Sequence, residues 1–243
     1  LPTIHKETPP VERKATMASQ FRAKVAEDIN PCTIWDILQL PDSRILLADN
    51  WNNTIKMYKP NYQYKDSLKF AERPWSLCSL SELEVAVTVP YQKTIHIIKV
   101  TDGMCKSRKI KTRLQCWSMA TLGDQLMICT WSDKHCILIL NMKGTEIKTI
   151  KPGDLQHIHL LYPSSIVTDL SKSNIYVSYL QNILAAYDLT SNVVYTYDDE
   201  TVNGPGSVDF DKEANIYLCG YFSCNVNLIS ADGRHVTTLI SKI

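Results

Sequence analysis

Short apolar runs recur along this chain at a nearly constant spacing. In RILLADN, EVAVTVP, QLMICTW, NIYVSYL and NIYLCGY the apolar stretch begins at Ile45, Val85, Leu126, Ile175 and Ile216, which gives steps of 40, 41, 49 and 41 residues. An apolar run precedes each of them, and a third run, a tight turn and a fourth run follow. Four short strands in a repeat of about 40–45 residues are typical of a β-propeller blade.

The runs within a repeat differ in polarity. The fourth runs, such as YKDSLKF and SRKIKTR, carry the charges, whereas the first runs are dense in Ile, Leu and Trp. We therefore expect the first run of each repeat to be the innermost strand and the fourth to be a solvated outer strand. Gly103, Gly144 and Gly233 supply the residue with positive φ that a hairpin turn needs.

Five nearly complete repeats follow one another, and the run FRAKVAE (residues 21–27) precedes them. We predict that this run is an outer strand that closes the ring by pairing with a sixth blade. The expected fold is all-β: a β-propeller of four-stranded antiparallel blades, of the six-bladed type with the last blade incomplete in this chain. Residues 20–243 form the propeller, and residues 1–19 are a disordered linker.

Composition excludes several classes of protein. The chain has 243 residues and is 44% hydrophobic, which excludes a largely disordered protein. No run approaches the roughly 20 apolar residues of a membrane-spanning helix. The 26 basic and 25 acidic residues leave a net charge of +1, which argues against a constitutive, charge-driven coat on nucleic acid.

Eight cysteines are present, but no CxxC pair occurs. Most lie within apolar runs such as MICTW and IYLCGY, so we expect reduced, buried thiols and a cytoplasmic location. His157 and His159 lie two residues apart in an insertion at residues 153–163, but a structural zinc site needs four ligands. We therefore predict no metal and no cofactor.

Four segments, DSRILLADNWNNTIKMY, PWSLCSLSELEVAVTV, CWSMATLGDQLMICT and NIYLCGYFSCNVNLIS, resemble the C-terminal NHL-repeat propeller of tripartite-motif-like proteins of molluscs and other invertebrates. Asp42, Arg44–Asp49 and Asn52 carry the blade motif, and the resemblance covers about residues 20–243. It implies RING, B-box and coiled-coil modules upstream, with dimerisation through the coiled coil. It also implies a ubiquitin ligase or scaffold whose propeller selects a protein target.

Aromatic and amide side chains recur at the turn between the second and third strands of each repeat. In a propeller these turns share one face with the connections between blades. A ring of aromatic side chains at the channel mouth would grip a peptide or stack bases; the alternative is that these residues pack between blades. The predicted binding residues are Trp51, Asn52, Asn53, Tyr91, Gln92, Trp131, Tyr179, Asn182, Tyr221 and Phe222.

A run of basic residues without an intervening acid occupies positions 106–113. Strand alternation places Lys109, Lys111 and Arg113 on one face and Lys106 and Arg108 on the other. The first three form a candidate nucleic-acid patch. The alternative is a solvated outer strand whose lysines protect a sheet edge.

Asp36, Asp169 and Asp209 lie in the predicted inner strands, where some hydrolase and lyase propellers hold a metal ion. A turn or an inter-blade hydrogen bond would also explain each of them. No nucleophile elbow, phosphate loop or HExxH helix is present. We predict a non-catalytic protein-recognition propeller that binds no membrane and no small-molecule substrate. RNA binding is the first alternative, and a metal-dependent hydrolase or lyase is the second.

Overall fold

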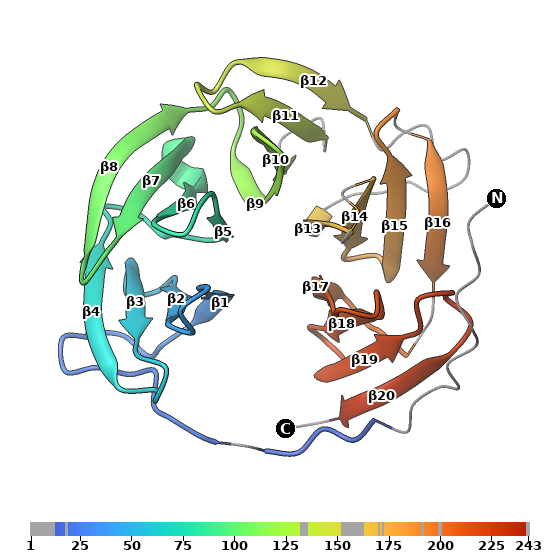
Figure 1. The fold of residues 1–243 in the computed structure, drawn as a ribbon, viewed down its shortest axis with the longest axis horizontal. Helices are drawn as coiled ribbons and strands as arrows, with labels where there is room; N and C mark the ends of the chain where they lie inside the picture. The colour runs from blue at the N-terminus through green and yellow to red at the C-terminus, as the bar shows by residue number, and fades with distance from the viewer. Residues whose placement is uncertain are drawn as a thin grey trace.

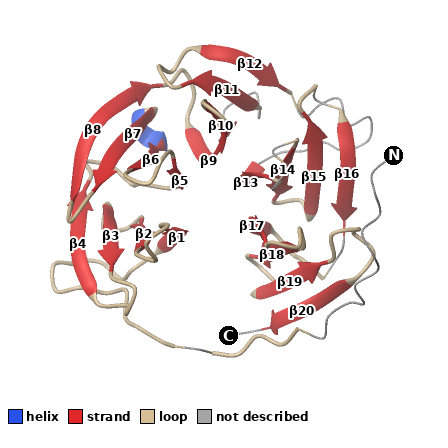
Figure 2. Ribbon diagram, in the orientation of Figure 1, coloured by secondary structure: helices blue, strands red, loops and turns tan. Residues whose placement is uncertain are grey.

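The chain folds into a ring of β-sheets. The computed structural model describes residues 13–17, 19–131, 136–151, 163–169, 171, 173–190, 192–198 and 201–241. These residues form five antiparallel sheets, each made of four consecutive strands. Figure 1 shows the sheets arranged as blades around a central opening, with the first strand of each blade innermost. Figure 2 shows strands throughout, together with the short helix η1 (Pro90–Gln92).

The blades follow one another in chain order. The first consists of β1 (Ile34–Gln39), β2 (Ile45–Asp49), β3 (Thr54–Tyr58) and β4 (Tyr64–Lys69); the second of β5 (Leu77–Ser79), β6 (Glu84–Val89), β7 (Thr94–Val100) and β8 (Met104–Lys111); the third of β9 (Cys116–Leu122), β10 (Gln125–Thr130), β11 (Ile137–Asn141) and β12 (Glu146–Ile150). The fourth consists of β13 (Pro163–Thr168), β14 (Asn174–Tyr179), β15 (Ile183–Asp188) and β16 (Val193–Asp198), and the fifth of β17 (Pro205–Phe210), β18 (Ile216–Gly220), β19 (Asn225–Ile229) and β20 (Val236–Ser241).

Apolar side chains fill the spaces between neighbouring blades. Leu46, Ile55 and Met57 of the first blade join Val85 and Val87 of the second in one buried cluster. Similar clusters involve the second and third, the third and fourth, and the fourth and fifth blades. Strand alternation gives each sheet two apolar faces, so stacking sheets side by side buries both.

A β-bulge interrupts the inner strand of four blades at equivalent points. In the pairing with the second strand, β1 skips Trp35, β9 skips Trp117 and β13 skips Ser164. The inner strand β17 shifts register between Pro205 and Val208. A bulged residue has no partner across the ladder, and bulges re-aim side chains. The bulges therefore turn residues of the inner strands toward the central opening.

Polar side chains next to the bulges connect one inner strand to the next. Asp36 Oδ2 accepts a hydrogen bond from the backbone N–H of Leu77 at 2.7 Å. Ser118 Oγ accepts one from the backbone N–H of Ile166 at 3.1 Å. The two donors belong to β5 and β13, each of which is the edge strand of its sheet, and the bonds fix the first blade to the second and the third to the fourth.

Residues 21–27 form no strand, in contrast to the sequence prediction. The Phe21 ring packs on Tyr58 and Tyr62, with centroids 5.0 and 5.1 Å away, and the Ala23 carbonyl accepts a hydrogen bond from the Tyr58 hydroxyl at 2.9 Å. The segment is held by side chains of the first blade rather than by a strand ladder. Figure 1 shows the segment beside the first blade.

The described residues form five blades, which corrects the prediction of a six-bladed type. Arg13 donates to Asp211 Oδ2 at 2.5 Å and to the Tyr217 hydroxyl at 2.9 Å, and it also pairs with Glu213. Because Arg13 contacts the fifth blade and Phe21 the first, the N-terminal segment has contacts on both sides of the space that Figure 1 shows between these two blades.

Several sequence predictions concern turns and flanking segments. Gly144 and Gly233 adopt positive φ, 88° and 73°, whereas the turn at Gly103 needs none. His157, His159 and residues 1–12 of the predicted linker lie outside the described residues. Among the described helices, none has the length and apolar character to cross a membrane.

Candidate recognition site

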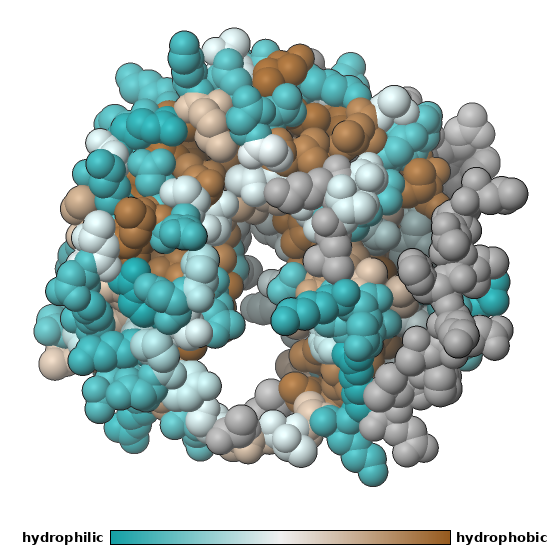
Figure 3. All heavy atoms as spheres, viewed as in Figure 1, coloured by the Kyte–Doolittle hydropathy of each residue, from teal (hydrophilic) through white to brown (hydrophobic). Residues whose placement is uncertain are grey.

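The described residues enclose a cavity of about 400 Å³ in the middle of the ring. Every blade contributes residues at or just before the start of its inner strand, and the third, fourth and fifth blades also contribute residues at or after the end of their second strand. Figure 3 shows the ring open at its centre. The lining residues are Thr33, Ile34, Trp35, Asp36, Trp75, Ser76, Trp117, Ser118, Trp131, Ser164, Ser165, Leu180, Gly206, Ser207, Cys219, Gly220, Tyr221 and Phe222.

Aromatic rings form a continuous arc along this wall. Trp75 lies between Trp35, with centroids 4.3 Å apart and rings stacked, and Trp117, at 4.5 Å and edge-on. Beyond Trp117, the Trp131 ring stacks at 4.5 Å. At the other end, Trp35 lies 6.2 Å from Tyr221, which in turn lies 5.1 Å from Phe222. We call these six residues the aromatic arc: Trp35, Trp75, Trp117, Trp131, Tyr221 and Phe222.

The cavity exists because one repeat position differs between blades. Trp35, Trp75 and Trp117 occupy this position in the first three blades, whereas Ser164 and Gly206 occupy it in the fourth and fifth. The two small residues leave open the space that two further indole rings would fill. The wall is therefore aromatic on one side and small and polar on the other.

Two polar atoms in the wall have no hydrogen-bond partner among the described residues. They are the indole Nε1 of Trp117 and the hydroxyl of Ser164, both buried. An unsatisfied buried polar group costs about 1–3 kcal/mol, which a ligand that supplies a partner would recover. The Trp131 Nε1–H, in contrast, donates to the carbonyl of Pro163 at 2.5 Å.

Asp36 is the one charged side chain among the described residues that line the cavity. Its carboxylate accepts hydrogen bonds from the backbone N–H groups of Leu77 and Ile37, at 2.7 and 2.8 Å. Desolvation, with a smaller contribution from the charge of Asp209, raises the pKa of Asp36 to about 6 despite these hydrogen bonds. The described wall thus carries negative charge at neutral pH and loses it in mild acid.

Some residues predicted from the turns lie at the cavity. Trp131, Tyr221 and Phe222 belong to the aromatic arc. Tyr91 is exposed and its ring lies 5.6 Å from Trp117, edge-on, so it extends the arc outward. These residues come from the second, third and fifth blades, and the structure brings them together around one opening.

Other predicted residues do not line the cavity. The Trp51 ring is exposed, as is Gln92. Asn52 hydrogen-bonds to Asn30 and to Asp49, and Asn53 adopts a positive φ of 56° in its turn. The remaining two serve the fold: the buried Tyr179 hydroxyl contacts the Tyr187 hydroxyl at 2.9 Å, and Asn182 Oδ1 accepts from the Gly204 N–H at 2.9 Å. Tyr179 lies in the buried cluster between the third and fourth blades, which matches the alternative that these aromatic residues pack between blades.

Sequence reasoning placed the inner-strand tryptophans in the core and did not select them for the site. Trp35, Trp75 and Trp117 form half of the aromatic arc. A signal was present: each is followed by a short polar residue, in the dipeptides WD, WS and WS, at the start of a repeat. Because this repeat position holds tryptophan in only three of the five repeats, the pattern indicates a cavity wall that is aromatic on one side only.

The basic run lies on a different surface. Lys109 and Lys111 are exposed on the outer strand β8, and Arg113 follows it. Arg113 Nη2 lies 3.5 Å from Glu146 Oε2 of the third blade, and the guanidinium of Arg108 donates to the Met142 carbonyl at 2.8 Å. Part of the run therefore connects neighbouring outer strands.

The three inner-strand carboxylates have separate structural roles. Asp36 bonds across blades, as described above, and Asp169 Oδ1 accepts the Ser173 N–H at 2.8 Å in a turn. Asp209 Oδ1 accepts the N–H of Phe210, the next residue, at 2.8 Å. Within the described part of the chain, they are not among the side chains close enough together to share a metal ion.

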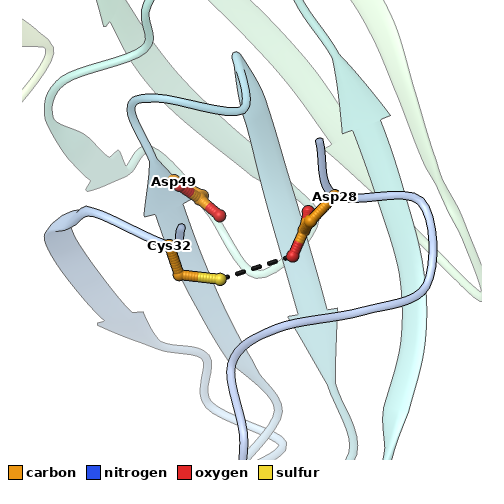
Figure 4. Close-up of side chains that lie close together, drawn as sticks. All are labelled: Asp28, Cys32 and Asp49. Carbon is orange, nitrogen blue, oxygen red and sulfur yellow. Dashed lines mark hydrogen bonds between the residues drawn. The ribbon is translucent and has the colours of Figure 1, made fainter. Parts of the chain in front are cut away.

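Asp28, Cys32 and Asp49 do cluster, as Figure 4 shows. The fully buried Lys56 places its Nζ among them, 2.5 Å from Asp28 Oδ2 and 2.6 Å from Asp49 Oδ2, with Cys32 Sγ at 3.3 Å. Burial alone would lower the Lys56 pKa, but the hydrogen bonds to the two carboxylates raise it above its usual value. A charged ammonium fills the centre of this cluster, which fixes the N-terminal segment to the first blade.

The cysteines are less uniformly buried than the sequence predicts. Cys116, Cys129 and Cys136 are buried, whereas Cys105 and Cys224 are exposed, and the other three are half-buried. Burial raises the pKa of the Cys116 thiol to about 12. All eight thiols are unpaired.

Comparison with known proteins agrees with the architecture. No protein-family model and no curated protein matches the sequence. Virginiamycin B lyase from Staphylococcus aureus is 11% identical, with a TM-score of 0.64 over 84% of this chain and 69% of that one. A streptogramin B lyase is 12% identical, with a TM-score of 0.64 over 84% and 67%; a protein of unknown function from Bacteroides caccae is 13% identical, with 0.62 over 80% and 71%. At these identities the likeness shows the β-propeller fold alone.

Proposed function

We propose that this propeller recognises a segment of another protein in the cavity lined by the aromatic arc. The arc carries the proposal, because aromatic side chains clustered in a concave site dominate the energy of protein recognition. The unpaired Trp117 Nε1–H would donate to a peptide carbonyl, and the Ser164 hydroxyl would bond to a second backbone group. The cavity of about 400 Å³ accommodates a side chain with its flanking backbone.

The proposal extends to the role of the parent protein. The blade motif at Asp42, Arg44–Asp49 and Asn52 supports a tripartite-motif-like scaffold or ubiquitin ligase in the cytoplasm, with this propeller as its target-binding part. Ubiquitin transfer and dimerisation would then belong to modules outside the propeller. Detection of ubiquitin conjugates on a protein captured by the propeller, dependent on the full-length parent, would support this role.

The proposal assigns binding and no reaction to the propeller itself. Acid–base catalysis uses positioned titratable groups, and Asp36 is the one carboxylate or imidazole among the described residues of the wall. Two of the structural neighbours are named virginiamycin B lyase and streptogramin B lyase. Incubation with virginiamycin B tests this alternative, and cleavage of virginiamycin B by the purified chain would overturn the assignment.

An immobilised library of random peptides tests the proposal directly. The wild-type chain should retain a defined set of peptides, and Ser164→Trp, which fills the cavity, should lose them. Trp51→Leu is the matched control, because Trp51 is an exposed tryptophan outside the cavity. Retention of the same peptides by Ser164→Trp would place recognition elsewhere and contradict the proposal, as would failure to retain any peptide.

RNA binding remains a second candidate because of the exposed basic residues on and after β8. This surface is on the outer rim, and the described wall of the cavity contains no lysine or arginine. Filter binding of RNA at low salt, compared between the wild-type chain and the double variant Lys109→Gln/Lys111→Gln, distinguishes RNA binding from protein recognition. Retention of RNA that falls steeply with salt and with these substitutions would favour RNA as the ligand.

A further inference from the structure

The charge of the cavity restricts the ligand. Asp36 lies in the wall, and Asp209 is near enough to raise its pKa. Among the described lining residues there is no cation to oppose this charge. A phosphate or carboxylate would meet repulsion there, whereas a cationic group would find a carboxylate in a partly desolvated site, where charge interactions are strong.

The shape of the aromatic arc restricts the ligand further. Trp35 and Tyr221 are nearly parallel, with an interplanar angle of 13°, but their centroids are 6.2 Å apart, compared with 4.3 Å for Trp35 and Trp75. Two ring contacts of about 3.5 Å each require a separation of about 7 Å to hold a flat group between them. Trp35 and Tyr221 are 38% and 62% exposed, so a small outward movement of Tyr221 would open such a slot.

The bulge in β1 brings the slot and the carboxylate together. Side chains normally alternate along a strand, but the bulge at Trp35 lets both Trp35 and Asp36 line the cavity. A planar ring face and a carboxylate therefore adjoin at consecutive residues. Guanidinium is the protein cation that suits both, because it is planar, stacks on aromatic faces and pairs with carboxylates.

Resting on the proposed function, we infer that the residue recognised in the cavity is an arginine of the target protein. Its guanidinium stacks between Trp35 and Tyr221 and pairs with Asp36. Lysine would supply charge without the flat face, and a neutral aromatic side chain would supply the face without the charge.

Three blocked tripeptides, Gly-Xaa-Gly with arginine, citrulline or glutamate at the centre, test the inference by calorimetric titration. Citrulline keeps the planar shape of arginine and removes its charge. The arginine peptide should bind at least tenfold more tightly than the citrulline peptide, and the glutamate peptide should not bind. Equal affinity for arginine and citrulline would overturn the cation inference and leave the cavity as a recognition site.

Two variants locate the interaction. In Asp36→Asn the preference for arginine over citrulline should disappear, because the carboxylate that creates it is gone. Tyr221→Leu removes one wall of the slot at an exposed position and should weaken binding of the arginine peptide at least fivefold. Trp51→Leu should leave the affinity for this peptide unchanged. Lack of saturable binding by the arginine peptide, or an arginine preference that survives Asp36→Asn, contradicts the inference. Failure of the peptide library described above would instead contradict the proposed function.

Discussion

The indole rings of Trp35 and Trp75 stack with centroids 4.3 Å apart, although the two residues belong to neighbouring blades. Each ring lies at or just before the start of an inner strand, and the hydrogen bond from the Leu77 N–H to Asp36 fixes the two strands to each other. The aromatic wall is thus a product of blade stacking and not of any single blade. Perturbing a blade junction should perturb the site.

Filling the fourth-blade position should close the cavity without unfolding the ring. Ser164→Trp introduces the residue that occupies the same position in three other blades, and it removes a hydroxyl that has no partner among the described residues. We expect a melting temperature close to wild type and at least tenfold weaker peptide binding. Circular dichroism and calorimetry measure the two quantities. Full binding by a folded Ser164→Trp would show that the cavity is not the site.

Gly204→Ala should displace Phe222 from the arc. Gly204 has φ +63°, and an added Cβ would overlap the Phe222 ring. Gly123 has φ +60° with no atom within 4 Å of an added Cβ, so Gly123→Ala carries the backbone strain alone, about 1 kcal/mol. Gly204→Ala should therefore lose both stability and peptide affinity, whereas Gly123→Ala loses stability only. Equal effects on affinity would exclude a role for Phe222.

Lys56→Met should destabilise the fold strongly. The variant leaves Asp28 and Asp49 as buried carboxylates without their cation, which costs roughly 3–5 kcal/mol of unfolding free energy. Lys65→Met, which breaks the exposed pair with Asp102, should cost about 0–1 kcal/mol. Urea unfolding compares the two variants. Equal midpoints would mean that the cluster does not hold the N-terminal segment on the first blade.

Binding of the arginine peptide should strengthen as pH rises through about 6. The pKa of Asp36 is raised to about 6, so the carboxylate is neutral below that pH and available to a cation above it. Its titratable neighbours are Asp209 on β17 and the Cys78 thiol on β5, whose pKa is raised to about 11 and which stays neutral here. Calorimetry at about pH 5 and pH 7 should differ by roughly tenfold. Asp36→Asn should remove the difference, and a pH dependence that persists in this variant would implicate another group.

The repeat pattern predicted the architecture well, because strand periodicity and turn chemistry are local properties of the sequence. Closure of the ring is not local: FRAKVAE has the alternation of a strand, but in the structure it packs on Tyr58 and Tyr62. The five described blades correspond to the five repeats in the sequence, whereas the six-bladed type is wrong, because the run expected to pair with a sixth blade forms no strand.

The candidate site was only partly predictable. Turn residues such as Trp131 and Tyr221 were selected because they recur in register, and they do line the cavity. Trp35 and Trp117 were assigned to the core, because strand alternation alone does not reveal a bulge that turns a side chain into the channel. The small residues Ser164 and Gly206, which leave the cavity open, give no positive signal in the sequence.

Nuclear magnetic resonance of the indole N–H groups tests the central claim most directly. The chain has five tryptophans, of which Trp35, Trp75, Trp117 and Trp131 line the cavity and Trp51 does not. Titration with the tightest peptide from the library should shift the four cavity signals, leave Trp51 in place, and produce no shifts in Ser164→Trp. A bound peptide that shifts Trp51 alone, or none of the five, would contradict recognition in the aromatic cavity.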